Sequence, residues 1–172
     1  GHTGDDPGTG RRRVIEAIRT AVSASRSETM VLLENTAGER NAVGSTLEEI
    51  RQVLDGIEDV CQAGICLDTC HAFAAGYEIR DGESVSRLAD DLENMVGLSR
   101  LRLIHLNDAK GERGSGLDRH EHIGMGSIGE KGIRAVLSHP SLCRVPFICE
   151  TPVDDRRDDA GNIIKVRELA GS

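Results

Sequence analysis

The stretch of residues 64–71, GICLDTCH, most constrains what this chain can fold into. A short apolar run bounded by glycine is typical of a buried β-strand. This run ends at an acid, Asp68, and His71 follows shortly after it. Three further apolar runs also end at a residue that can bind a metal ion: residues 29–33 at Glu34, 101–104 at His105 and 145–149 at Glu150. Strands that each deliver an oxygen or nitrogen ligand at the carboxyl end are the layout of a metal site on a β/α barrel.

The spacing of these four strand ends predicts how the strands are connected. One βα unit takes about 30 residues or more, and each interval here is long enough for one unit. We therefore expect successive parallel strands joined by right-handed crossovers. Four units make half of a (β/α)₈ barrel, which typically needs about 250 residues. The 172 residues are thus expected to form a single α/β domain, an incomplete barrel of about four βα units.

Helical periodicity fills the intervals between the expected strands. Apolar residues recur on one helical face in residues 11–26, 84–96, 130–137 and 161–170, and after the overlapping capping signals at Ser45 and Thr46. Residues 1–10, 71–77 and 107–129 are predicted to be irregular connections. The longest of them contains Asp118, His120 and His122, and a loop of this length is usually functional or disordered.

Composition narrows the class of protein. Hydrophobic residues make up 38% of the chain, as in a folded globular domain, and no apolar run approaches the roughly 20 residues of a membrane span. Five cysteines without a CxxC pair favour reduced thiols in a cytoplasmic protein. The net charge of −8 argues by itself against a nucleic-acid partner. Bound divalent cations would concentrate positive charge in one cleft, so the net charge leaves DNA binding open.

Further candidate ligands lie beside the strand ends. Asp68 and His71 can point into one cleft, and Asp118 and His120 face the same way if their backbone is extended. Each alone fits a helix cap or a turn, but together they are hard to explain as structure, because buried charges need partners. His122 is predicted to be a solvated loop residue. Of the cysteines, Cys66 is expected to pack inward, and Cys70 is an alternative ligand.

These motifs, in this order, resemble the endonuclease IV family of abasic-site nucleases. The matching segments are residues 33–38 (LENTAG), 66–77 (CLDTCHAFAAGY), 105–110 (HLNDAK), 118–120 (DRH) with the glycines up to Gly129, and 150–152 (ETP). The resemblance covers nearly the whole chain and about the second half or two thirds of a family member. It implies the C-terminal part of one TIM barrel of the xylose isomerase-like type.

The resemblance also implies three Zn²⁺ ions in the mouth of the barrel. Glu34 would bridge two of them. The first ion would also be held by His2, in a His-x-Gly match that can instead be a cloning remnant, and by a histidine upstream. The second would be held by Asp68, His105 and Glu150, and the third by His71, Asp118 and His120. By the same resemblance, Glu34 and Glu150 would be catalytic. Asn35, Asn107 and Arg119 would support the ligands, contact phosphate or make only loop hydrogen bonds.

The implied activity is metal-assisted hydrolysis of the phosphodiester 5′ to an abasic site in duplex DNA, a step of base excision repair. The protein is expected to be a cytoplasmic, nucleoid-associated monomer that does not enter a membrane. One alternative is a metal-dependent sugar isomerase or epimerase, although two Phe, one Tyr and no Trp supply little of a sugar-binding wall. The other is a non-catalytic zinc-binding fragment. We expect weak cleavage or none from this chain, because the first zinc site lacks a ligand.

Overall fold

The computed structural model describes residues 6–25 and 28–171. Four strands form one parallel sheet in the order β1-β2-β3-β6. Their bounds are Val31–Glu34 for β1, Ala63–Asp68 for β2, Leu101–His105 for β3 and Phe147–Ile148 for β6. The predicted parallel α/β architecture is confirmed, and each strand lies where an apolar run predicts it.

The helices contact one another in the order α1, α2, α4, α5 and α6, which follows the order of the strands. Their bounds are Pro7–Ser25 for α1, Leu47–Asp55 for α2, Gly82–Met95 for α4, Gly129–Ser138 for α5 and Asp159–Ala170 for α6. Short 3₁₀ turns, Leu98–Arg100 and Leu142–Arg144, precede β3 and β6. Apolar side chains of the helices and strands form one buried core that includes Leu54, Ile65, Phe73, Leu92, Ile104 and Ile133.

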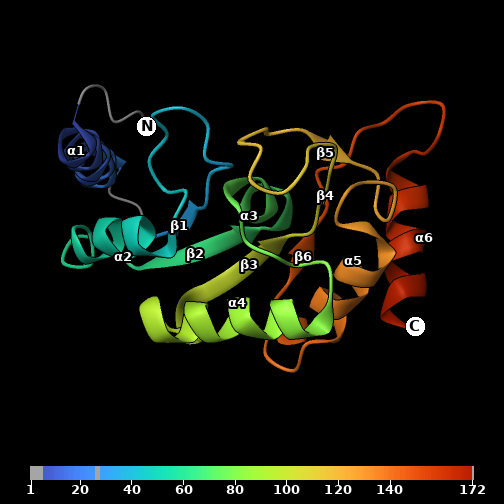
Figure 1. The fold of residues 1–172 in the computed structure, drawn as a ribbon. Coiled ribbons are helices and arrows are strands. Elements are labelled where there is room, and N and C mark those ends of the chain that lie inside the picture. Colours follow the sequence, from blue (N-terminus) through green and yellow to red (C-terminus); the bar gives the residue numbers. More distant parts are fainter. Residues whose placement is uncertain (1–5, 26–27, 172) are drawn as a thin grey trace.

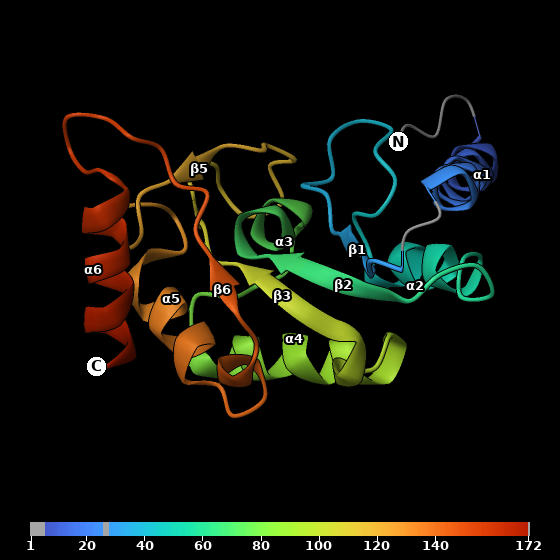
Figure 2. The ribbon, with the colours of Figure 1, turned by 180° about the vertical axis from the view of Figure 1, so that it is seen from behind.

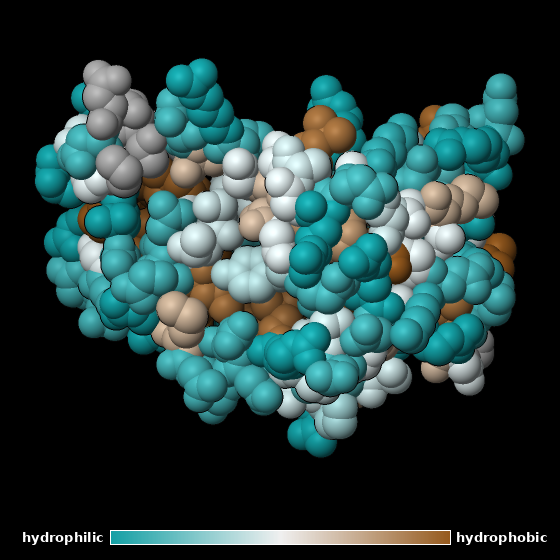
Figure 3. Space-filling view, in the orientation of Figure 1, coloured by the Kyte–Doolittle hydropathy of each residue, from teal (hydrophilic) through white to brown (hydrophobic). Residues whose placement is uncertain are grey.

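Within the described residues, β1 and β6 are the two edge strands of the sheet and have one neighbour each. Seen from behind, β2, β3 and β6 cross the molecule with no described helix drawn in front of them (Figure 2). The opposite face is mostly hydrophilic, with apolar patches near its middle, where Figure 1 draws β2 above α4 (Figure 3). In a closed barrel the inward face of the sheet is filled by side chains. The four parallel strands form an open sheet that does not close on itself, so they correspond to part of a barrel.

The start of α2 shows which of the two predicted caps is used. The Thr46 side chain accepts the N–H of Glu49, which makes Thr46 the N-cap. The Glu49 carboxylate accepts the N–H groups of Gly44 and Ser45. Leu47 and Ile50 are then buried on the inner face of the helix, as their spacing predicts.

Three segments differ from the prediction. Residues 71–75, predicted to be irregular, belong to helix α3 (Thr69–Ala75), because the Asp68 side chain accepts the N–H of His71 and caps a helix directly at the strand end. Helix α1 begins within the predicted first loop, where Asp6 accepts the N–H of Thr9. The predicted loop 107–129 contains a short antiparallel ladder of β4 (Asp108–Ala109) and β5 (His120–Glu121).

The register places the strand ends at one rim of the sheet. Glu34 is opposite Cys66, Asp68 is opposite His105, and His105 is opposite Ile148. Figure 1 shows the carboxyl ends of β2 and β3 directed toward α3 and the β4–β5 ladder. Among the described residues, no helix is both long and apolar enough to cross a membrane.

Candidate metal centre

The four predicted strand-end ligands form one cluster. Ligand atoms of Glu34, Asp68, His105 and Glu150 lie within 4.8 Å of one another. Nδ1 of His105 is 3.3 Å from Glu34 Oε1, 3.8 Å from Asp68 Oδ2 and 3.2 Å from Glu150 Oε2. Each side chain comes from the carboxyl end of a different strand or from the residues after it, so the parallel register brings them together.

A second cluster lies beside the first and contains His71, Asp118 and His120. Asp118 Oδ1 is 3.1 Å from His71 Nε2 and 3.6 Å from His120 Nε2. Helix α3 provides His71, and the segment entering β5 provides the other two residues. Asp68 adjoins both clusters, because its Oδ2 also lies 3.7 Å from His120 Nε2.

The histidines of the second cluster are prepared to accept a cation. Nδ1 of His71 lies 2.9 Å from the carbonyl oxygen of Asn35, and Nδ1 of His120 lies 2.8 Å from that of Glu150. A carbonyl only accepts, so each Nδ1 carries a proton, and each Nε2 presents a lone pair whenever the ring is neutral. Both Nε2 atoms are buried without a hydrogen-bond partner. This tautomer, held by a carbonyl, is the usual one of a metal-ligating histidine.

The carboxylates of the two clusters also favour the binding of cations. Burial raises the pKa of Asp68, a fully buried carboxylate. Burial would lower the pKa of His71, but the hydrogen bond with Glu34 and the charges of Asp68 and Asp118 outweigh it and raise the pKa to about 10. A proton on His71 therefore partly balances the carboxylates when no cation is present. Imidazole nitrogens and carboxylate oxygens are donors that suit zinc, so the residues fit the implied metal.

The three residues predicted to support the ligands, Asn35, Asn107 and Arg119, all lie at this rim, and each makes different contacts. Asn35 donates to the carbonyl of Asp68 and accepts its N–H, so it bonds the backbone of the ligand. Asn107 bonds the Asp68 carboxylate itself, at 2.7 Å. Arg119 is exposed, and its guanidinium donates to the carbonyl of Asp118.

His122 corrects the prediction of a solvated loop residue. It is fully buried, with Nε2 2.9 Å from Asp154 Oδ1 and Nδ1 3.0 Å from Asn162 Nδ2. Asn162 Oδ1 accepts the N–H of Ile123, so its amide group donates to His122. His122 therefore links the end of β5 to α6 and belongs to neither cluster. The sequence does not reveal this role, because both partners lie more than 30 positions away.

The two cysteines near the clusters are protonated. Sγ of Cys66 lies within 4.8 Å of ligand atoms of Glu34 and His105. Sγ of Cys70 lies within 4.8 Å of ligand atoms of Asp68 and His120. Burial raises the pKa of each thiol to about 12. Because a thiolate is the form that binds metal, a cation would have to displace this proton before either cysteine could serve as a ligand. The remaining predicted ligand, His2, lies outside the described residues.

Asp108 is a fully buried acid whose role the sequence pattern does not predict. Its buried carboxylate accepts the N–H groups of Ala109, Gly124, Gly126, Ile128 and Gly129. This arrangement gathers the glycine-rich turn after β5 around the end of β4. The only sequence signal is an acid at a strand end, followed at a distance by a cluster of glycines.

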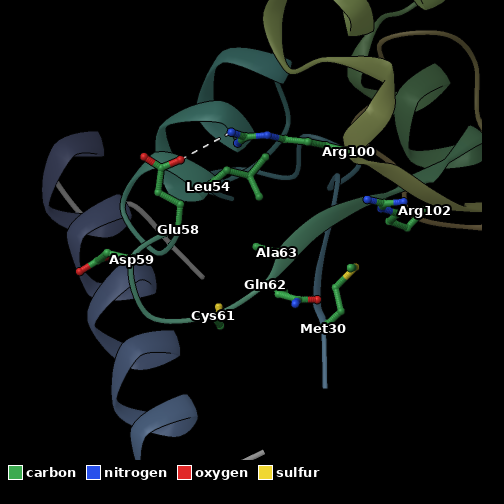
Figure 4. A pocket seen from close by; sticks show the side chains of 9 residues that line it. All are labelled: Met30, Leu54, Glu58, Asp59, Cys61, Gln62, Ala63, Arg100 and Arg102. Atoms are coloured by element: carbon green, nitrogen blue, oxygen red, sulfur yellow. Dashed lines mark ion pairs between the residues drawn. The ribbon is translucent and has the colours of Figure 1, made fainter. Parts of the chain in front are cut away.

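A pocket of about 540 Å³ lies at the other end of the sheet (Figure 4). It is lined by Met30, Leu54, Glu58, Asp59, Cys61, Gln62, Ala63, Arg100 and Arg102. These residues include the start of β2 and β3, and Arg100 pairs with Glu58 at 3.5 Å. In β/α barrels the catalytic groups lie at the carboxyl ends of the strands, so this pocket is on the opposite rim.

Comparisons with known proteins agree with the fold. The model of a family described as the xylose isomerase-like TIM barrel matches residues 1–169. A protein of Methanoculleus marisnigri named probable endonuclease 4 is 55% identical over 99% of this chain and 61% of its own length. A protein of Nitrosopumilus maritimus with the same name is 42% identical, over 98% of this chain and 62% of its own.

A solved structure is also similar. The crystal structure of endonuclease IV from Thermus thermophilus superposes with a TM-score of 0.79 and 34% identity, over 94% of this chain and 56% of that chain. This chain thus spans little more than half of the length of the proteins it matches. The chain belongs to the xylose isomerase-like TIM barrel family, and the similar proteins described here are named probable endonuclease 4 or endonuclease IV.

Proposed function

We propose that this chain carries zinc sites of an abasic-site endonuclease that hydrolyses the phosphodiester 5′ to the lesion in duplex DNA, in base excision repair. The observation that carries the proposal is the pair of neighbouring clusters, one containing Asp68 and the other within 3.7 Å of its carboxylate. The names of the relatives support it. Residues 1–172 would be the C-terminal part of one endonuclease IV barrel.

Zinc would be bound by both clusters. Glu34, Asp68, His105 and Glu150 would hold one ion, and His71, Asp118 and His120 another. His2 and Glu34 stay predicted ligands of a third ion. When bound, zinc makes water acidic enough to act as a nucleophile at neutral pH and neutralises charge on the phosphate.

The side chains of this chain would orient the substrate and move protons. Glu34 is partly exposed at the rim, where its carboxylate can accept a proton from the attacking water. Arg119 is exposed between Asp118 and His120, where its guanidinium can contact a DNA phosphate. A net charge of −8 opposes DNA binding, so the cations at the rim would supply the local attraction.

The association state and the location of the protein are proposed only from the sequence. We expect a monomer, in the cytoplasm and near the nucleoid. Duplex DNA with an abasic site is the proposed partner.

Zinc content and nicking of a duplex with one abasic analogue test the proposal together. We expect the purified chain to bind at least two zinc ions and to nick weakly or not at all on the 5′ side, with loss of any nicking on chelation. His71→Gln removes one bound ion and abolishes nicking, whereas the matched control His139→Gln, at the end of α5, changes neither. Zinc binding without nicking would support a non-catalytic fragment, and turnover of a free sugar would support an isomerase.

A further inference from the structure

Asn107 occupies a central place at the rim. It follows β3, which lies between β2 and β6 in the sheet. Its side chain is fully buried, and it reaches the ends of both neighbouring strands. Nδ2 donates to Asp68 Oδ2 at 2.7 Å, and Oδ1 accepts the N–H of Glu150 at 2.8 Å. One amide group thus joins two candidate ligands of the first cluster.

The orientation of this amide is fixed by chemistry. The N–H of Glu150 only donates and the Asp68 carboxylate only accepts, so the oxygen and nitrogen of Asn107 cannot be exchanged. The backbone is held as well, since Thr69 Oγ1 donates to the carbonyl of Asn107 at 2.7 Å and accepts its N–H at 2.9 Å.

The hydrogen bond from Asn107 holds the second oxygen of the Asp68 carboxylate. Oδ1 of Asp68 accepts the N–H of His71 at 2.8 Å, and Oδ2 accepts from Asn107. A carboxylate has about four lone-pair sites, so each oxygen keeps one for a cation. Oδ2 lies 3.8 Å from His105 Nδ1 and 3.7 Å from His120 Nε2. The remaining lone pair of Oδ2 is thereby directed at the space between the two histidines.

We propose that Asn107 is a positioning residue that sets the direction of the Asp68 carboxylate and its separation from Glu150 for a divalent cation. The inference rests on the proposed metal-binding function and concerns the geometry of the site. Hydrogen-bond partners of metal ligands typically change metal affinity about 10- to 100-fold when they are replaced.

The test compares Asn107→Asp with Thr69→Val. Asn107→Asp keeps the shape and the acceptor for the Glu150 N–H, but it places an acceptor beside Asp68. Thr69→Val is also isosteric, and it removes the bonds to the backbone of residue 107 and a longer one, at 3.3 Å, to the carbonyl of His105, while the Asn107 side chain keeps its bond to Asp68. Both variants are expected to lower the melting temperature. Only Asn107→Asp is expected to weaken Zn²⁺ binding, by about 10- to 100-fold in competition with a chromophoric chelator.

A second readout reports ligand geometry. Co²⁺ replaces Zn²⁺, and its visible absorption depends on the arrangement of the ligands. We expect an altered spectrum in Asn107→Asp and an unaltered one in Thr69→Val, with circular dichroism showing both variants folded at the temperature of the titration.

The outcomes separate this inference from the proposed function. Equal Zn²⁺ affinity in Asn107→Asp and the unmodified chain, or an equal loss in both variants, would overturn the positioning role while the metal site stands. Failure of the unmodified chain to bind either ion would overturn the metal site and the positioning role together.

Discussion

At the scale of single residues, the rim contains buried polar groups that are hydrogen-bonded to one another. Asp68 adjoins both clusters, and Asn35 and Asn107 bond its backbone and its carboxylate respectively. Asp108 plays a comparable part for the backbone of the turn that follows β5. Because such groups are buried, the cost of removing one partner exceeds the gain from an average hydrogen bond.

Asp108→Asn is expected to destabilise the protein by about 3 kcal/mol. Oδ1 of Asp108 accepts the N–H groups of Ala109 and Ile128, and Oδ2 accepts those of Gly124 and Gly126. In either orientation, the NH₂ group of an asparagine side chain would face two backbone N–H groups that also donate. Chemical denaturation measures the loss, and Asp91→Asn on the exposed face of α4 is the matched control. A loss equal to that of the control would contradict the account.

At the scale of elements, two groups of side-chain contacts hold segments in place. One joins α6 to β5, and the other lies between α3 and α4. His122 and Asn162 fix α6 to the end of β5, and Arg157 adds a bond from its guanidinium to the carbonyl of Ile123 at 2.7 Å. Between α3 and α4, Glu78 accepts the N–H groups of Ile79 and Arg80 and pairs with the side chain of Arg80.

Asn162→Ala is expected to cost about 2–4 kcal/mol of the free energy of unfolding, because His122 and the N–H of Ile123 lose buried partners. Hydrogen exchange should show faster exchange in α6 and after β5 than in β2. Uniform protection across these elements, at unchanged stability, would show that the connection does not hold α6.

Glu78→Gln is expected to reduce the loss of stability in acid. The hydrogen bond from Arg80 lowers the pKa of Glu78 from 4.5 to about 2. A carboxylate with a lowered folded pKa stabilises the protein above its unfolded pKa, and the contribution disappears as the pH falls from about 4.5 toward 2. Denaturation midpoints at about pH 7 and pH 3 measure this change. An unchanged acid dependence in the variant would refute the assignment.

At the scale of the whole molecule, the sequence predicts the parallel sheet and the residues at its rim, because both follow from local patterns. Apolar runs define β2 and β3, and polar residues at their ends define the candidate ligands. The parallel register, confirmed at Asp68 and His105, then places those ends together.

The sequence pattern fails where a segment is too short to show a period and where the structure depends on distant partners. Residues 71–75 form a helix because Asp68 caps them, although the apolar spacing is too short to signal α3. His122 is buried because Asp154 and Asn162 meet it from the far end of the chain. The turn after β5 depends on Asp108, and a Cβ at Gly126 would collide with the carbonyl oxygen of Ala109. Such contacts leave no periodic pattern in the sequence.

The central claim is that the strand ends and the turn before β5 together hold metal ions. Anomalous X-ray scattering at the zinc absorption edge, from crystals soaked in Zn²⁺, tests it most directly. The account predicts one peak among Glu34, Asp68, His105 and Glu150, and a second among His71, Asp118 and His120. Peaks elsewhere with neither cluster occupied, for example at the pocket beside Arg100, would contradict it.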